Sequence, residues 1–214
     1  MKVIVLCPSA HPILQYLTKW QKCPTNHYSV ELYNDALDIR DRGDILFLVS
    51  FPQIVDLTIR KLFSHTLVLH ASDLPEGRGW SPHVWDVISG RDRITVSLIS
   101  AEDRVDTGAI WNQKTIDLKG YELFDEINHM VFQAEIDLMS WFCSHVGDVR
   151  PRPQDSDRKE TYRSRRCPED SRIDPTKSIE EQFNLLRVCD PDRYPAYFEL
   201  CGKKFKLIIE RYED

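Results

Sequence analysis

The sequence predicts an α/β protein with a mostly parallel central sheet and a small C-terminal appendage. Short, continuous apolar runs rich in Val, Ile and Leu occupy residues 2–7, 44–51 and 67–70, which is the pattern of strands buried on both faces. Segments with helical spacing of apolar residues separate these runs. Strands that alternate with helices form βαβ units, and such units build a parallel sheet with right-handed crossovers.

Helices are predicted between these strands and after them. Residues 12–22 and 55–63 place apolar side chains three or four positions apart, and so does the longer run 121–143; this spacing marks a helix with one face in a core. We expect the long helix to cover the sheet. Another helix is predicted after Gly79, with Ser81 as its N-cap and Pro82 at its first position, where both residue types are favoured.

A change of composition predicts the domain boundary. Residues 147–175 hold four prolines and a dense mixture of charges, which favours an extended connector. The connector would join a catalytic domain of residues 1–146 to a subdomain of residues 176–214. That subdomain is predicted to contain a helix over 178–188, which starts with a Ser178–Glu181 capping box, and a hairpin that turns near Gly202.

Composition excludes several classes of function. The chain has 214 residues, a net charge of −6 and no apolar run of the roughly 20 residues that a membrane span needs. The acidic balance argues against a nucleic-acid partner. Six cysteines without a C-x-x-C pair indicate neither a disulfide framework nor a zinc site. The apolar N-terminal run is shorter than that of a signal peptide, so we expect a cytoplasmic protein with reduced thiols, no metal and no membrane partner.

Two polar segments stand where a parallel sheet places its ligands. His70 ends a predicted strand, and Asp106 opens a loop later in the chain; ligands bind outside the carboxyl ends of such strands. A carboxylate that orients an imidazole forms a general acid–base pair. A half-buried structural histidine and an Asx turn are the alternatives. The motif G-x-G-x-x-G is absent, which argues against a dinucleotide site.

These two segments resemble the formyltransferase family that uses 10-formyltetrahydrofolate. The family pattern is N-x-H-x-S-x-L-P, then R-G, then D-T-G-x-I; this chain has LHASDLPEGRGW from residue 69 and DTGAI from residue 106. The resemblance implies a shortened Rossmann-like formyltransferase domain with His70 and Asp106 as catalytic residues. The residues that it implies for folate binding are Ser72, Leu74, Pro75, Arg78, Gly79, Thr107 and Gly108.

The C-terminal part looks like the accessory segment of sugar N-formyltransferases, which formylate an amino group on a nucleotide-linked deoxysugar. The segments that carry this likeness are RCPEDSRID, NLLRV and RYPAYF, and the basic residues 163–166 would supply charge for a diphosphate. We expect folate and a nucleotide-diphosphate amino sugar as partners and leave a homodimer open. The residues expected near the sugar nucleotide are Trp80, Arg166, Asp174, Asn184, Arg187, Tyr194, Pro195 and Ala196.

The chain departs from the family pattern at two positions. Val68 stands where the family has the asparagine that holds the formyl oxygen, and Ile99 stands where many relatives have a second histidine. Loss of one such donor costs on the order of a hundred- to a thousandfold in rate. A backbone N–H, protonated His70 or another side chain such as Asn112 replaces the donor, or the enzyme is slow or inactive.

The implied reaction is formyl transfer to a neutral amine without a covalent enzyme intermediate. His70 would take the proton, Asp106 would orient His70 and help to protonate the leaving folate nitrogen, and activity is expected to fall through the acid range in which imidazoles protonate. Within the family, methionyl-tRNA formyltransferase is disfavoured because the acidic chain ends before that enzyme's C-terminal barrel. Glycinamide ribonucleotide formyltransferase is disfavoured because CPSAHP, at residues 7–12, lacks its glycine-rich phosphate loop. A non-catalytic folate or nucleotide-sugar binding module is the alternative from another class.

Overall fold

The computed structural model describes residues 1–212 and is built on a six-stranded sheet. The strand order is β2-β1-β3-β4-β6-β7. The first four strands of this order pair in parallel, whereas β4–β6 and β6–β7 pair antiparallel. The bounds are Lys2–Leu6 for β1, Ser29–Tyr33 for β2, Gly43–Val49 for β3, Phe63–His70 for β4, Arg93–Ser100 for β6 and Ile110–Asp117 for β7.

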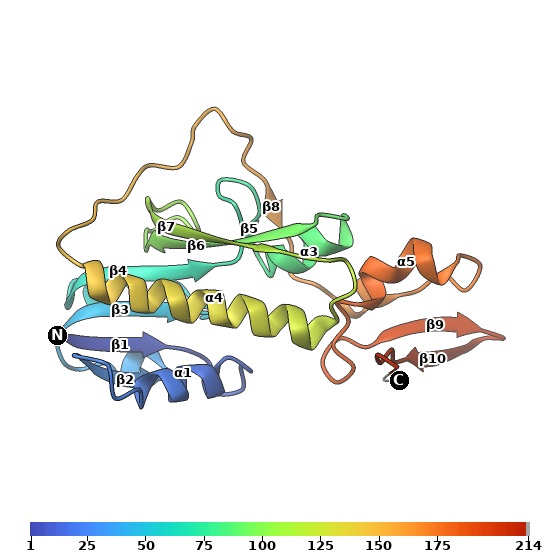
Figure 1. Cartoon of the computed structure of the whole chain (residues 1–214), viewed down its shortest axis with the longest axis horizontal. Helices are drawn as coiled ribbons and strands as arrows, with labels where there is room; N and C mark the ends of the chain where they lie inside the picture. The colour runs from blue at the N-terminus through green and yellow to red at the C-terminus, as the bar shows by residue number, and fades with distance from the viewer. Residues whose placement is uncertain (213–214) are drawn as a thin grey trace.

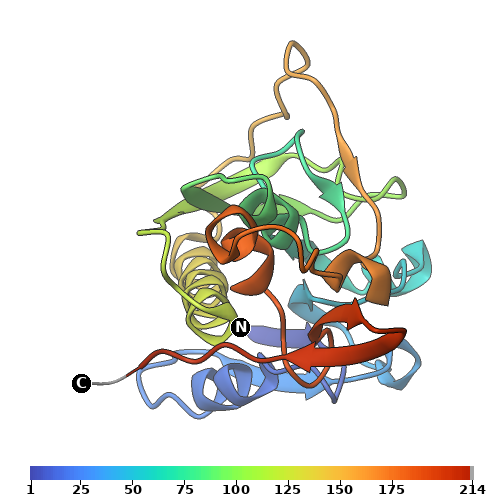
Figure 2. The ribbon, with the colours of Figure 1, turned by 90° about the vertical axis from the view of Figure 1, so that its right-hand side faces the viewer.

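Helices cover both faces of the sheet and close two apolar layers around it. Helices α1 (Leu14–Gln21) and α4 (Phe124–His145) pack over one face in a core that includes Phe47 and Phe142, and α3 (Pro82–Ile88) joins this layer (Figure 2). On the other face, the short η1 (Ala36–Asp38) and the segment around α2 (Leu57–Arg60) bury Leu46 and Leu48. The prediction that the long helix covers the sheet is confirmed.

The sequence pattern missed three strands of the central sheet and predicted one helix that is too long. Strands β2, β6 and β7 were not predicted, because none is a continuous apolar run: β2 is mostly half-buried and β7 carries Asn112, Gln113 and Lys114. The expected helix over 55–63 is wrong in length. Asp56 caps a single turn, after which Phe63 opens β4 and packs into the second core.

The N-cap of α3 differs from expectation. Ser81 occupies the N-cap position, but its side chain makes no capping hydrogen bond and its backbone is left-handed, with φ 43°. A capping side chain normally requires an extended backbone at that residue, so the conformation of Ser81 explains the absent bond. Pro82 does begin the helix, as predicted.

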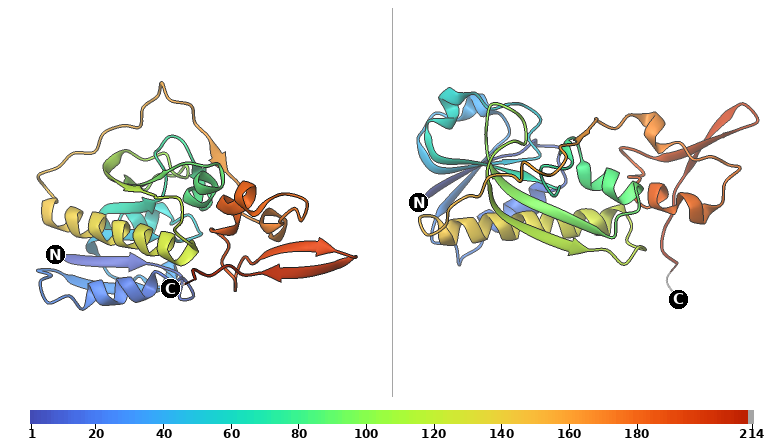
Figure 3. Two further views of the ribbon diagram at one scale, coloured as in Figure 1. Left: turned by 45° about the vertical axis from the view of Figure 1, so that its right-hand side comes forward. Right: turned by 90° about the horizontal axis from the view of Figure 1, so that it is seen from above.

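A C-terminal unit lies beyond the carboxyl ends of the parallel strands (Figures 1 and 3). It contains α5 (Ile179–Leu186) and the hairpin of β9 (Ala196–Leu200) and β10 (Lys203–Leu207) around a small apolar cluster. Ser178 and Glu181 form the predicted capping box. Arg187 ties the unit to the main domain through Glu122, with 3.4 Å between Nη1 and Oε2.

The connector leaves α4 and arches over the β6–β7 side of the sheet before it reaches this unit (Figure 1). It is extended for most of its length, but β8 (Tyr162–Arg163) pairs with β5 (Arg78–Gly79), and η2 spans Pro168–Ser171. Ile173 packs into the C-terminal cluster. Across residues 1–212, no helix combines the length and the apolar character needed to cross a bilayer.

Candidate functional site

A cavity of about 750 Å³ opens at the carboxyl ends of β1, β3 and β4. This volume falls within the range of small-molecule sites. The lining comes from the loops that follow the parallel strands, the start of α3, the loop after β6, the N-terminal half of α4, the connector and the C-terminal unit. The cavity therefore joins the two regions that the sequence had suggested separately as the places for chemistry and for substrate binding.

His70 and Asp106 lie together in the cavity wall. His70 Nδ1 is 3.5 Å from Asp106 Oδ1, and the two side chains are 8% and 7% exposed. His70 Nε2 is 2.9 Å from the Gly77 carbonyl oxygen. A carbonyl oxygen only accepts hydrogen bonds, so Nε2 carries a proton and Nδ1 faces the carboxylate. The pair can therefore hold one exchangeable proton between Nδ1 and Oδ1.

Gly79 and Gly108 allow the loops that carry His70 and Asp106 to pass close to neighbouring backbone segments. Gly79 donates its N–H to Asp106 Oδ2 at 2.8 Å and has a φ of 96°; a Cβ there would lie 2.4 Å from the Arg163 carbonyl oxygen. A Cβ on Gly108 would lie 1.8 Å from the Ser100 carbonyl oxygen. Only glycine fits either position. We call residues 70–80 and 103–108 the catalytic loops.

Gln154, in the connector, joins the two catalytic loops. Its Nε2 donates to the carbonyl oxygens of Asp106 and Gly108, at 2.8 and 3.0 Å, and its Oε1 accepts from Arg78 Nη2 at 2.8 Å. Asp106 has a left-handed backbone, with φ 56°, which is uncommon for a residue other than glycine. The Gln154 amide thus holds the backbone conformation that aims the Asp106 carboxylate.

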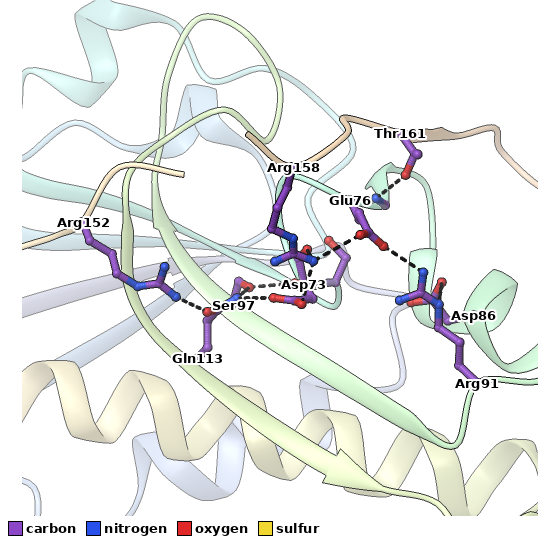
Figure 4. Close-up of polar contacts among 11 residues, drawn as sticks. Asp73, Glu76, Asp86, Arg91, Ser97, Gln113, Arg152, Arg158 and Thr161 are labelled. Carbon is purple, nitrogen blue, oxygen red and sulfur yellow. Dashed lines mark hydrogen bonds and ion pairs between the residues drawn. The ribbon is translucent and has the colours of Figure 1, made fainter. Parts of the chain in front are cut away.

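Further polar contacts fasten the connector to the first catalytic loop (Figure 4). Arg158 Nη2 donates to Asp73 Oδ2 at 2.8 Å and lies 3.3 Å from Glu76 Oε1. Arg91 bonds the same Glu76 carboxylate and holds its pKa below the usual value. Thr161 Oγ1 accepts the Gly77 N–H at 2.8 Å. The loop is therefore braced along its length by a segment that follows it by some eighty positions.

Positive charge gathers at the part of the cavity nearest the C-terminal unit. Arg165 lies over the Trp80 ring at 5.1 Å, and Arg166 and Arg193 lie over Tyr194 at 5.5 and 5.9 Å. All five of these residues line the cavity, and we call them the arginine rim. Guanidinium groups bind phosphate oxygens in bidentate fashion, so the rim can hold a diphosphate.

A different part of the cavity holds titratable groups that are uncharged at neutral pH. We call it the α4 chamber; it is lined by His11, His83, Phe132 and Glu135. The His11 and Phe132 rings pack edge to face, with centroids 5.6 Å apart. Burial raises the pKa of Glu135 to about 8 and is the main cause that lowers the pKa values of His11 and His83 to about 4.

The structure divides the residues that the sequence had suggested for binding. Gly79, Trp80, Arg166 and Tyr194 line the cavity beside His70 and Asp106. The other residues that were expected to bind folate do not line the cavity. Leu74 and Pro75 are buried, and the Ser72 carbonyl accepts a hydrogen bond from Ser97. Arg78 binds Glu160 and Gln154, Thr107 donates to the Arg104 carbonyl, and the Gly108 carbonyl accepts from Gln154.

The expected sugar-nucleotide residues of the C-terminal unit differ most from the prediction. Arg187 is 2% exposed, and its guanidinium contacts the Glu122 carboxylate and donates to Asn184 Oδ1. Arg187 and Asn184 therefore bind each other, and neither residue lines the cavity. Asp174 bonds Thr176, and Ala196 is buried at the start of β9. Pro195 lies outside the cavity lining too. A sequence match does not reveal whether a polar side chain points outward or is spent on an internal partner.

The two departures from the family pattern face each other. Val68 and Ile99 are partners in the β4–β6 ladder and pack in one apolar cluster with Leu74 and Ile110. Val68 also lines the cavity. Asn112, considered above as a replacement donor, does not line the cavity; its Oδ1 accepts the Gln113 N–H.

Several residues of the site escaped the sequence analysis. Arg193 carried only the weak signal of a basic neighbourhood, and Gln154 and Glu135 gave no signal that sets them apart from surface residues of a connector and a helix. Arg165 was expected only as one of the basic residues 163–166. Within the described residues 1–212, no three His, Cys, Asp or Glu side chains gather as metal ligands.

A family model and several curated proteins match the sequence of this chain. A family model described as formyl transferase matches residues 25–141. The methionyl-tRNA formyltransferase of Agathobacter rectalis is 32% identical over 171 residues, which cover 77% of this chain and 54% of that protein. The chain spans about half the length of the curated relatives that it matches.

Similar solved structures carry three different descriptions. A methionyl-tRNA formyltransferase from Clostridium thermocellum has a TM-score of 0.83 at 21% identity and covers 100% of this chain and 94% of its own. A 4-N formyltransferase from Francisella tularensis has a TM-score of 0.77 at 18% identity, with coverage of 100% and 98%. HypX from Aquifex aeolicus, in complex with tetrahydrofolic acid, has a TM-score of 0.76 at 19% identity and covers 98% of this chain and 37% of its own. At these identities the likeness concerns the fold.

Proposed function

Because this chain belongs to the formyl transferase family, we propose that it transfers a formyl group from 10-formyltetrahydrofolate to the amino group of a nucleotide-linked deoxy-amino sugar. The observation that carries the proposal is the His70–Asp106 pair, buried in the wall of the same cavity that the arginine rim lines. A general acid–base pair and a phosphate-binding rim within one cavity are what this transfer needs.

The pair handles the single proton that the reaction moves. As the amine nitrogen bonds to the formyl carbon, the amine loses a proton, and the bond from that carbon to the folate nitrogen breaks with uptake of a proton. His70 Nδ1 and Asp106 Oδ1 face each other at 3.5 Å, so the pair can take the first proton and return the second. Nε2, fixed on the Gly77 carbonyl, keeps the ring orientation during both steps.

The cavity lining suits the two substrates in different places. Phe51, Ile54, Val55 and Val105 make an apolar part, which fits the flat ring system of a folate. The arginine rim suits the diphosphate of a sugar nucleotide. The folate donor is therefore assigned to the apolar part and the nucleotide to the rim, with the formyl group and the amine meeting at His70.

Methionyl-tRNA is the second candidate acceptor, and the names of the curated relatives favour it. A tRNA partner would need an extended basic surface, because phosphate contacts along the backbone dominate such binding. Here the net charge is −6, and the arginines of the rim gather at one cavity. These observations favour the compact anionic acceptor.

A two-stage experiment tests the proposal. Nucleoside diphosphates are first screened by thermal shift, since a ligand at a hundred times its Kd stabilises the folded state by about 2.7 kcal/mol. Release of tetrahydrofolate from 10-formyltetrahydrofolate is then measured with aminodideoxyhexoses linked to the preferred nucleotide, and with methionyl-tRNA. We expect turnover with a sugar nucleotide. Turnover with methionyl-tRNA alone would assign the other acceptor, and binding without any turnover would leave a non-catalytic module.

A further inference from the structure

Glu135 is a buried titratable group that the proposed acid–base chemistry does not use. It lies on the face of α4 that meets the cavity, and the residue is 4% exposed. Its Oε2 is buried and forms no hydrogen bond with any group of residues 1–212. A buried polar atom without a partner is destabilising, and the cavity is the side from which a partner can come.

Among the described residues 1–212, no charged group shifts the pKa of Glu135, and burial alone raises it. Arg193 of the arginine rim is a positive charge that acts on His11 in the α4 chamber and lowers its pKa further. Within residues 1–212 the carboxyl forms no ion pair with Lys, Arg or His. His11 and His83 stay neutral because burial lowers their pKa values to about 4, and the nearby Cys7 thiol is neutral because its pKa is raised to about 12. An ionised carboxylate without a cation is very costly in such a place. Because burial raises the pKa of Glu135 to about 8, the neutral acid is its major form at pH 7.

A neutral carboxylic acid offers one O–H donor and one carbonyl acceptor at adjacent atoms. A hydroxyl group complements it, because a hydroxyl both donates and accepts. The charges of the proposed acceptor belong elsewhere: the arginine rim suits its phosphates, and the amine must meet His70. An uncharged chamber beside them suits the part of the sugar ring that bears hydroxyl groups.

We propose that Glu135 determines acceptor specificity by hydrogen-bonding, as a neutral acid, an uncharged hydroxyl of the sugar in the α4 chamber. This inference rests on the proposed function, since it assigns one more contact to the same acceptor. Glu135 is a recognition residue here: it takes no part in the proton transfer, which belongs to His70 and Asp106.

Two variants and one control ligand test the assignment. Glu135→Gln keeps one donor group and one acceptor atom without charge, whereas Glu135→Leu removes both. Calorimetry, without folate, measures binding of a panel of UDP- and dTDP-linked 3-amino and 4-amino dideoxyhexoses. For the best ligand we expect E135Q to stay within about threefold of the wild-type Kd and E135L to raise Kd about tenfold, the usual effect of one lost hydrogen bond. The affinity for tetrahydrofolate should not change in either variant.

The possible contrary results are distinct. Equal affinity in E135L and wild type would show that the acceptor does not touch Glu135, and a loss in E135Q as large as in E135L would show that an ionised carboxylate is required. A loss of tetrahydrofolate binding in E135L would move the contact to the folate part of the cavity. Each of these overturns the inference. If the wild-type protein binds no sugar nucleotide of the panel, the proposed acceptor fails instead, and this result differs from all three.

The protonation state of Glu135 has its own measurement, which needs no ligand. An infrared difference spectrum between wild type and E135Q at pH 7 should contain the carbonyl stretch of a protonated carboxylic acid. Carboxylate bands in its place would contradict the neutral acid, whatever the acceptor is.

Discussion

The acid–base pair and the arginine rim line one cavity and are held in contrasting ways. His70 and Asp106 are buried, and hydrogen bonds from Gly79 and contacts to the Gly77 carbonyl fix both side chains. Arg165 and Arg193 are exposed and rest on the faces of Trp80 and Tyr194. Stacking on a ring fixes a guanidinium less firmly than a buried hydrogen bond does. The first region is suited to moving a proton over a set distance, and the second to adjusting to an anion.

The contrast predicts that substitutions in the buried pair act on rate. We expect His70→Asn and Asp106→Asn each to lower kcat for formyl transfer by at least about a hundredfold, since positioned acid–base groups contribute about 10²–10⁴-fold. Binding of tetrahydrofolate, measured by calorimetry, should stay close to wild type in both variants. A kcat within twofold of wild type in either variant would remove that residue from the chemistry.

Gln154 tests whether the fixed geometry of the first region matters. Gln154→Met removes its hydrogen bonds at similar volume, and we expect kcat to fall between about tenfold and a hundredfold, because small misplacements of reacting groups cost rates of this order. KM values should change little. Gln154→Glu keeps an acceptor for Arg78 but cannot donate to the Asp106 and Gly108 carbonyls, so its kcat should fall as well.

The matched control for Gln154 is Gln133→Met. Gln133 lies on α4 and bonds Asp137 at the exposed surface, away from the cavity lining. Its kcat should equal that of wild type. If Gln154→Glu keeps the wild-type rate, the amide donation to the second catalytic loop is irrelevant to Asp106.

The arginine rim is expected to act on affinity alone. Arg193→Met should raise KM for the nucleotide-linked acceptor about tenfold and leave kcat unchanged, since a hydrogen bond to a charged group contributes about 1.5–3 kcal/mol and exposure reduces that value. Arg93→Met is the control, because Arg93 is exposed and pairs with Asp117 on the outer strands. An equal change in KM for both variants would show a general effect of charge. A fall in kcat for Arg193→Met would contradict the prediction that the arginine rim acts on affinity alone.

Val68 offers the smallest expected change in rate. Val68→Asn places an amide beside Ile99 in an apolar cluster, so we expect the rate to stay level or fall and stability to drop by about 1–3 kcal/mol. Chemical denaturation and initial rates measure the two quantities. A gain in kcat that approaches a hundredfold, at unchanged KM, would show instead that the formyl oxygen lacks a donor in the natural protein.

The elements that could be predicted are those with a strong local pattern. Continuous apolar runs identified β1, β3 and β4, and helical spacing identified α1, α4 and α5. Strands β6 and β7 escaped because neither is a continuous apolar run: β6 mixes polar with apolar residues, and β7 contains the polar run NQKT. Both also pair antiparallel where βαβ logic predicts parallel pairing. The helix predicted over 55–63 is present only as the one-turn α2, because Asp56 caps its start and Phe63 already belongs to β4.

Within the site, too, the sequence predicted the residues of a strong local motif and missed those that only tertiary contacts bring there. The motif residues His70 and Asp106 meet in space although Asp106 follows β6, which runs antiparallel to β4. The loop after β6 folds back to His70 and is held there by hydrogen bonds from Gly79 and Gln154. Arg187 matched a motif equally well and is buried on Glu122, whereas Gln154 and Glu135 belong to the site through long-range packing that no local pattern records. Which polar residues face a cavity depends on tertiary contacts, and those decide between a binding residue and an internal one.

A single-turnover measurement shows whether His70 catalyses formyl transfer from the folate to the sugar amine. Wild-type protein and His70→Asn, each in excess over 10-formyltetrahydrofolate, are mixed with the nucleotide-linked amino sugar that binds best, and the formylated sugar is followed by mass spectrometry. The account predicts one formyl group on the sugar nitrogen per folate consumed with wild type, and at least about a hundredfold slower formation with His70→Asn. Folate consumption without N-formyl sugar, or equal rates in the two proteins, would contradict it.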